Sequence, residues 1–168
     1  MAHSLVLALF DDASTAAAAA RGLRNLGLPR ERVSIVAKSH DAEGALAKIS
    51  DGSPGSEIED SRLASRIGEL SAHVLASAAL GLPGVGPIVA DGPLAAALAE
   101  AAGHLAGDIG RTLASAGIDR GEAERWESRI RQGAILVGAH VDEGTAPAAR
   151  DALVRSGARE ITAGTWPD

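Results

Sequence analysis

Residues 5–29 read LVLALFDDASTAAAAARGLRNLGLP, and this stretch decides the fold because it holds a strand, a turn and a helix in succession. The apolar run 5–10 predicts a buried strand. Asp12 then supplies a turn and a helix N-cap residue. An alanine-rich helix over 15–26 follows, and Gly27 stands where left-handed backbone commonly ends a helix.

The C-terminal part of the chain repeats this plan. Residues 33–37 predict a second strand, which completes the first strand–helix–strand unit. Further along, 134–141 predict a strand, 146–156 a helix that ends at Gly157, and 159–165 a final strand. The two segments align without gaps through their helices, so they predict two equivalent units that share one sheet.

Together the units predict an α+β fold: a ferredoxin-like split βαβ sheet of four antiparallel strands with helices on one face, formed by the N- and C-terminal halves. The predicted domains are 1–39 and 117–168 as one α/β sandwich domain, 40–56 as a flexible loop, and 57–116 as an inserted antiparallel helical hairpin. A lone strand–helix–strand unit also fits a parallel sheet, but four strands with one long interruption favour the split plan.

The sequence of the insert predicts two helices separated by a break. The first helix carries an apolar stripe that continues into small residues: Leu63, Ile67, Leu70, Val74, Ser77, Ala78 and Gly81. The segment LPGVGP at 82–87 predicts the break, because its two prolines and two glycines cannot continue a helix. Pro93 is expected to begin the second helix, whose stripe is Leu94, Leu98, Ala102, Leu105, Ile109 and Leu113. We expect a structural role for the break residues Pro83, Gly84, Gly86, Pro87 and Pro93, since no nucleotide-binding fingerprint is complete there.

A third helix is expected to follow Asp119 and Glu122, which form a capping pair. Trp126 lies on the apolar face of that helix, so it is expected to seal the helix against the sheet or the hairpin.

Three stretches, in order along the chain, carry a family resemblance. They are the opening strand with Asp11-Asp12 and its helix, the loop at 82–87 with Ala90 and 92–96, and the segment from Ala116 to Ala134. In these stretches the chain resembles a bacterial family of heat-induced, or general, stress proteins. The resemblance implies a small α/β protein with no assigned catalysis, and therefore an expression context and no reaction. The chain departs from the family pattern within the hairpin, where charged or imidazole side chains replace small and apolar ones: Glu69, His73, Glu100, His104 and Asp108.

Composition excludes several classes of function. The net charge of −6 argues against a nucleic-acid partner, because phosphate neutralisation needs clustered Lys and Arg. The absence of cysteine removes disulfides, thiol catalysis and Cys-bound metal, and fits a cytoplasmic location. The first residues show no signal peptide pattern. Prolines interrupt the apolar stretch 74–99, so membrane association is not expected.

Two histidines of the hairpin, His73 and His104, are the predicted binding residues. They lie at comparable distances on either side of the break, so antiparallel helices would bring them to similar heights. Paired imidazoles on facing helices bind haem iron or a divalent metal in helical bundles. Nearby acids could add metal ligands: Glu69, Glu100 and Asp108. The remaining histidines are expected at the surface or in loops: His3, His40 and His140.

No catalytic residue is predicted. Nucleophilic catalysis needs Ser or Cys beside a His and an orienting acid, and no such signature is recognisable in the sequence. The paired carboxylates Asp11-Asp12 and Asp142-Glu143 stand where helices need N-caps, and capping accounts for them.

The function predicted first is a non-enzymatic stress-response protein that acts by self-association or partner binding, with the hairpins of two chains forming a four-helix bundle. The alternatives are a haem- or metal-binding protein that uses His73 and His104, and a small-molecule sensor on the ferredoxin-like half.

Overall fold

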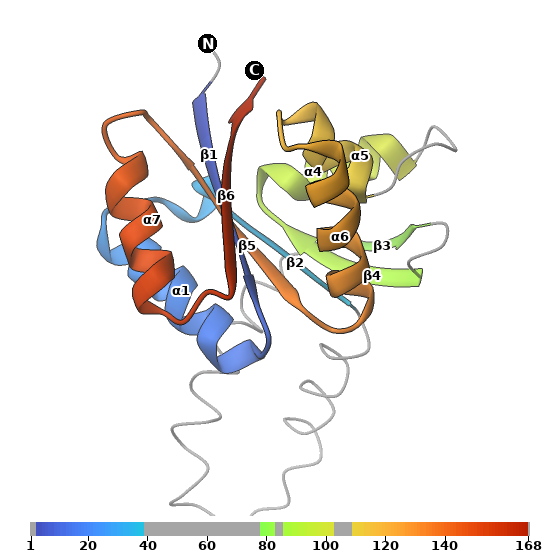
Figure 1. Ribbon diagram of the computed structural model, residues 1–168, viewed down its shortest axis with the longest axis horizontal. Helices are drawn as coiled ribbons and strands as arrows, with labels where there is room; N and C mark the ends of the chain where they lie inside the picture. Colours follow the sequence, from blue (N-terminus) through green and yellow to red (C-terminus); the bar gives the residue numbers. More distant parts are fainter. Residues whose placement is uncertain (1–2, 39–77, 83–85, 103–108, 168) are drawn as a thin grey trace, which may run out of the picture.

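A computed structural model describes residues 3–38, 78–82, 86–102 and 109–167 of the chain. These residues form three layers, with a β-sheet between two layers of helices (Figure 1). The elements follow in this order: β1 (His3–Phe10), α1 (Ala13–Asn25), a 3-10 turn η1 (Arg30–Arg32), β2 (Val33–Lys38), β3 (Ala78–Leu82), β4 (Gly86–Asp91), α4 (Pro93–Ala102), α5 (Ile109–Ser115), α6 (Arg120–Arg131), β5 (Ile135–Val141), α7 (Ala146–Arg155) and β6 (Glu160–Trp166).

The sheet has the strand order β3-β4-β2-β5-β1-β6, and every neighbouring pair is antiparallel. The four strands of the two repeated segments are adjacent in it, as β2-β5-β1-β6. The predicted mixed α/β class and the antiparallel pairing of these four strands are therefore confirmed. Two further strands, β4 and β3, extend the sheet beyond β2.

Both faces of the sheet are covered. Helices α1 and α7 pack on one face, and α4, α5 and α6 lie on the other (Figure 1). Side chains of a strand alternate between faces, so Val6, Ala8 and Phe10 of β1 contact the α1–α7 layer while Leu5 and Leu7 contact the other. The expectation that helices cover one face only is wrong, because the helices between β4 and β5 cover the second face.

The predicted helix is wrong at 78–82, where the chain forms β3, and the predicted break at 82–87 leads into β4. The two strands pair from Ala78 opposite Ala90 to Leu82 opposite Gly86. Pro87 is tolerated in β4 because the pairing of β4 with β2 begins only at Ile88, so no hydrogen bond to β2 needs a proline N–H. The small residues at the end of the first predicted stripe have only a weak intrinsic preference for helix over strand, so they do not specify a helix.

The second predicted helix does begin at Pro93, but α4 ends at Ala102 and α5 begins at Ile109. The apolar residues Leu94, Leu98 and Leu113 are each at most 1% exposed, in a cluster that also holds Trp126. The part of the predicted apolar stripe that the structure describes is thus buried within one chain. The first stripe, Leu63 to Val74, lies outside the described residues.

The third helix agrees with its prediction. Glu122 donates its backbone N–H to the Asp119 carboxylate at 3.1 Å at the start of α6, and Trp126 is fully buried against the sheet side of α6. The ends of α1 and α7 also agree, since Gly27 and Gly157 both have positive φ. In the part of the chain that the structure describes, no helix is both long enough and apolar enough to cross a membrane.

Candidate functional site

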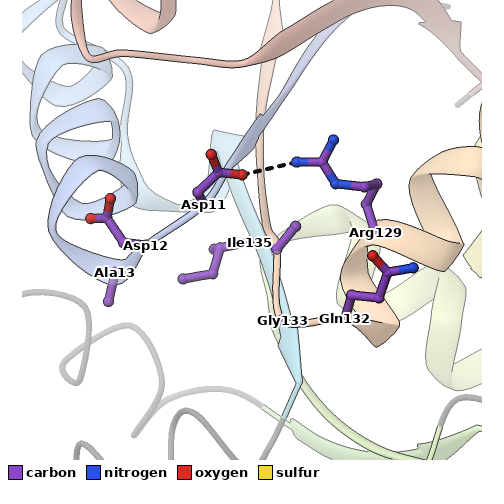
Figure 2. A pocket seen from close by; sticks show the side chains of 8 residues that line it. Asp11, Asp12, Ala13, Arg129, Gln132, Gly133 and Ile135 are labelled. Atoms are coloured by element: carbon purple, nitrogen blue, oxygen red, sulfur yellow. Dashed lines mark hydrogen bonds and ion pairs between the residues drawn. The ribbon is translucent and has the colours of Figure 1, made fainter.

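A cavity of about 540 Å³ lies at the end of β1 that leads into α1. Three junctions of the fold meet there: the β1–α1 turn, the last turn of α6, and the start of β5. Its lining residues are Asp11, Asp12, Ala13, Arg129, Gln132, Gly133, Ala134 and Ile135. Figure 2 shows the Asp12 and Gln132 side chains on opposite sides of the cavity, with Ile135 between them.

The N-terminus of α1 is fixed at one wall of the cavity. Asp12 has extended backbone, and its carboxylate accepts the Thr15 backbone N–H at 2.9 Å. This is the N-cap that the sequence predicted. The Thr15 hydroxyl donates in return to the Asp12 carbonyl oxygen at 3.1 Å. The first residue of α1, Ala13, therefore stands at the cavity with its helix start held in place.

The opposite wall is held by ion pairs that centre on Asp11. Its carboxylate accepts from the Arg129 guanidinium at 2.9 Å (Figure 2) and from Arg159 at 2.8 Å. Arg129 also donates to Glu160 at 2.8 Å, and the indole N–H of Trp126 donates to the other Glu160 oxygen at 3.1 Å. The capping explanation is therefore wrong for Asp11, which connects β1 to α6 and to the start of β6.

The second pair of carboxylates, Asp142 and Glu143, does not cap α7. The N-cap residue is Thr145, without a side-chain hydrogen bond. The Asp142 carboxylate lies 3.6 Å from the Arg32 guanidinium, and both side chains are largely exposed. Helix α7 instead begins with Pro147 in its first turn, where a missing N–H has no cost.

A chain of polar side chains crosses the sheet at the opposite end of β1. His3 Nε2 and His140 Nδ1 lie 3.0 Å apart, and His140 Nε2 lies 2.9 Å from Ser34 Oγ. Ser34 Oγ in turn accepts the backbone N–H of Leu94 at 3.1 Å. The Trp166 ring meets the His140 ring edge to face, with centroids 5.1 Å apart. The prediction that His140 is a surface or loop residue is wrong, since it is 2% exposed in β5.

Burial, followed by the nearby His3 and Arg32, lowers the pKa of His140 to about 4. The pKa of His3 is also lowered, first by burial and then by Arg32, while Asp142 acts in the opposite direction. Both imidazoles are therefore neutral at pH 7. A neutral imidazole has one donor and one acceptor nitrogen, which is what a hydrogen-bonded chain needs.

Ser34, His140 and His3 are arranged like the nucleophile, the base and the orienting group of a catalytic triad. Ser34 is, however, completely buried, and its oxygen already accepts the Leu94 N–H. A substrate has no access to this hydroxyl. The arrangement is a structural contact between β2, β5 and α4.

The predicted binding residues His73 and His104 lie outside the described residues, as do His40, Pro83 and Gly84. The haem or metal site therefore stays a prediction. Of the other predicted loop residues, Gly86 and Pro87 belong to β4, and Pro93 is the first residue of α4. Among the described residues, no three His, Asp or Glu side chains form a group that could hold a metal ion.

Sequence reasoning missed both the Asp11 ion pairs and the buried imidazoles. A signal for His140 was present, because the predicted strand 134–141 contains it at a position that alternates with Val137 and Ala139. In a strand covered on both faces, that position must also be buried. Comparisons of the chain with protein-family models, with curated proteins and with solved structures found no match.

Proposed function

We propose that this chain is a non-enzymatic binding protein that holds a small polar molecule in the cavity between α1 and α6. The observation that carries the proposal is the cavity itself: about 540 Å³, with polar side chains from the β1–α1 turn and from the end of α6 in its lining. Pockets for small molecules commonly have volumes of about 300–1,000 Å³ and a few fixed polar groups. Of the three functions that the sequence favours, this one corresponds to the small-molecule sensor.

The lining groups define the chemistry of the ligand. Helix geometry leaves the first backbone N–H groups of α1 without partners inside the helix, so Ala13 offers a donor at the cavity. Asp12 offers carboxylate oxygen as an acceptor, and Gln132 offers both kinds of group. Asp11 and Arg129 neutralise each other and keep the walls in position. A compact molecule with both donors and acceptors, such as an amino acid or a polyol, matches this set.

The strand order supports a ferredoxin-like scaffold for this site. In the order β6-β1-β5-β2, the units β1–α1–β2 and β5–α7–β6 interleave, and each unit has its helix on the same face. We infer that the β3–β4 hairpin and α4–α6 are an addition to this split βαβ plan. Such scaffolds take their function from the site that they carry, so the cavity defines the function and the fold does not.

The stress-response role and the cytoplasmic location rest on the family resemblance and on composition. Within that role, association without turnover is what we propose, because the one serine–histidine contact described above is inaccessible to a substrate. Self-association through the insert has less support than ligand binding, since Leu94, Leu98 and Leu113 are buried within one chain. A bundle between two chains would need apolar surface from elsewhere in the insert.

The test is thermal unfolding of the full chain with a panel of probes at millimolar concentration: amino acids, polyols, diamines and nucleosides. Gln132 is exposed and lies at the end of α6, so Gln132→Trp fills the cavity without removing a buried group. Ser128→Trp is the matched control, because Ser128 is also an exposed residue of α6 but does not line the cavity.

We expect at least one class of probe to raise Tm in the wild type and in Ser128→Trp, with the increase lost in Gln132→Trp. Binding to the folded state alone raises stability by mass action, so the size of the shift follows probe concentration. Equal shifts in both variants would place binding elsewhere. No shift with any probe would contradict the proposed ligand class.

A further inference from the structure

Helix α4 begins without a side-chain cap of its own. The residue before Pro93 is Gly92, with φ of +78°. A Cβ atom on Gly92 would lie 2.3 Å from the Val33 carbonyl oxygen and 2.8 Å from Ser34 Cα. Glycine is therefore required by the close approach of this turn to β2, and glycine has no side chain with which to accept a helix N–H.

Ser34 takes the place of the missing cap. Its hydroxyl oxygen accepts the N–H of Leu94, the second residue of α4, at 3.1 Å. The first N–H groups of a helix have no intrahelical partner, so a side chain of β2 satisfies one of them here. This hydrogen bond connects the insert to the part of the sheet that the two repeated units form.

The proton of the Ser34 hydroxyl determines the state of the histidines. Ser34 Oγ accepts from Leu94, and the described partner for its own proton is His140 Nε2, at 2.9 Å. His140 then carries its proton on Nδ1 and donates it to His3 Nε2, at 3.0 Å. This tautomer is assigned from the hydrogen-bond network, and it gives each of the three contacts from Leu94 to His3 one donor and one acceptor.

A second proton on His140 disrupts this arrangement. Nε2 then carries a hydrogen and can no longer accept from Ser34, so the hydroxyl must turn away and its proton loses this acceptor inside a fully buried site. If His3 is protonated as well, two imidazolium groups face each other. Of the charged groups around the pair, Arg32 of η1 opposes protonation of both rings, and Asp142 after β5 favours it only at His3.

We propose that the His3–His140–Ser34 chain is an acid-sensitive contact that holds the start of α4 on β2 at neutral pH and releases it in acid. Release uncovers His140 to water, because Leu94 packs over the same part of the sheet, close to Gly138. The ligand cavity lies at the other end of β1, so this device does not depend on the proposed function.

The size of the effect follows from proton linkage. Release of α4 from β2, which gives the open state, raises the pKa of His140 from about 4 toward its ordinary 6.5. The population of the open state should therefore rise about 30-fold between pH 7.5 and pH 5. The measurement is amide hydrogen exchange at these two pH values, corrected for intrinsic exchange rates. Helix α7 serves as the internal reference, since it packs on the other face of the sheet.

We expect amides of α4 to lose about 30-fold in protection at the lower pH, a loss that α7 does not share. In His140→Gln, which keeps a neutral donor and acceptor at this position, the protection of α4 should change much less with pH, with His3 as the remaining titrating group of the chain. Arg32→Gln alters only a half-exposed side chain, and it should reduce the loss because Arg32 opposes protonation of His140 in the closed state.

Three results would overturn the proposal. They are wild-type protection of α4 that does not depend on pH, an equal loss in α4 and α7, and an equal loss in the wild type and His140→Gln. If His140→Gln does not fold, the Arg32→Gln variant tests the role of His140 instead. A loss in Arg32→Gln as large as in the wild type would then refute the role of His140.

Discussion

The free energy of unfolding should fall steeply as the pH falls from 6.5 toward 4, because His140 is held neutral in the folded chain. The pKa of His140 is lowered from 6.5 to about 4, first by burial and then by His3 and Arg32. Between these two values the unfolded chain binds more protons than the folded chain. Protons then favour unfolding, so the stability is lost as the pH falls through this window and is fully present above it.

The magnitude follows from the two pKa values. The complete difference of about 2.5 units corresponds to roughly 3 kcal/mol. At pH 5 the folded group is still mostly neutral and the unfolded group is mostly charged, so the loss relative to pH 8 is about 2 kcal/mol. His3 contributes in the same direction, since its pKa is lowered as well.

The assay is urea unfolding at pH 8 and at pH 5, followed by the fluorescence of the buried Trp126. The matched variant is His140→Gln, which cannot gain a proton at this position. The loss between the two pH values should be smaller by about 2 kcal/mol in His140→Gln than in the wild type. The titrating groups outside this contact are common to the two proteins, so their contributions cancel; only His3 has its partner changed by the substitution. An identical pH dependence in both would refute the reasoning.

Three further substitutions, two of them with a control substitution, test other contacts of the fold by urea unfolding at pH 7.5. Gly92→Ala should cost more than about 2 kcal/mol, because its Cβ would lie 2.3 Å from a backbone oxygen. Gly27→Ala has a similar φ but open space, so about 1 kcal/mol is expected; equal costs would contradict the clash. Glu127→Gln should cost about 1.5–3 kcal/mol, since this buried carboxylate accepts an N–H at the start of α5 at 2.7 Å. The exposed Glu124→Gln should cost under about 0.5 kcal/mol. A larger loss there would contradict the difference expected between the buried and the exposed carboxylate. Asp11→Asn should cost about 1 kcal/mol, less in 0.5 M salt, because its ion pairs are half-exposed; a cost that does not depend on salt would refute this.

The two repeated units were predictable because their signals are local. A run of apolar residues, an N-cap at Asp12 and glycines with positive φ at Gly27 and Gly157 each act within one element. The boundaries of α1, α6 and α7 follow from these signals to within a few residues.

The insert was predicted poorly because its residues carry weak local preferences. Ala78 and Gly81 fit a helical stripe by spacing, but the chain pairs them with Ala90 and Pro87 as strands. Pairing between strands depends on neighbours and on burial more than on intrinsic preference. Pro93 was predicted correctly, because a proline in the first turn is a local signal.

Neither the His3–His140–Ser34 contacts nor the Asp11 ion pairs could be predicted from the spacing of residues along the sequence. The contact between Ser34 and His140 joins residues 106 positions apart, and that between His3 and His140 joins residues 137 apart. Asp11 meets Arg129 across 118 positions. Such contacts depend on the register of the paired strands and on where α6 packs, and local sequence patterns specify neither.

The central claim is that the cavity between α1 and α6 is the binding site, and its most direct test is a map of where a ligand acts. The measurement is a two-dimensional ¹H–¹⁵N NMR titration of the full chain with the probe that raises Tm most. We expect saturable shifts at the amides of Ala13, Gly133, Ala134 and Ile135, which line the cavity. Shifts confined to other parts of the chain, or no saturable shift at these four amides, would contradict the account.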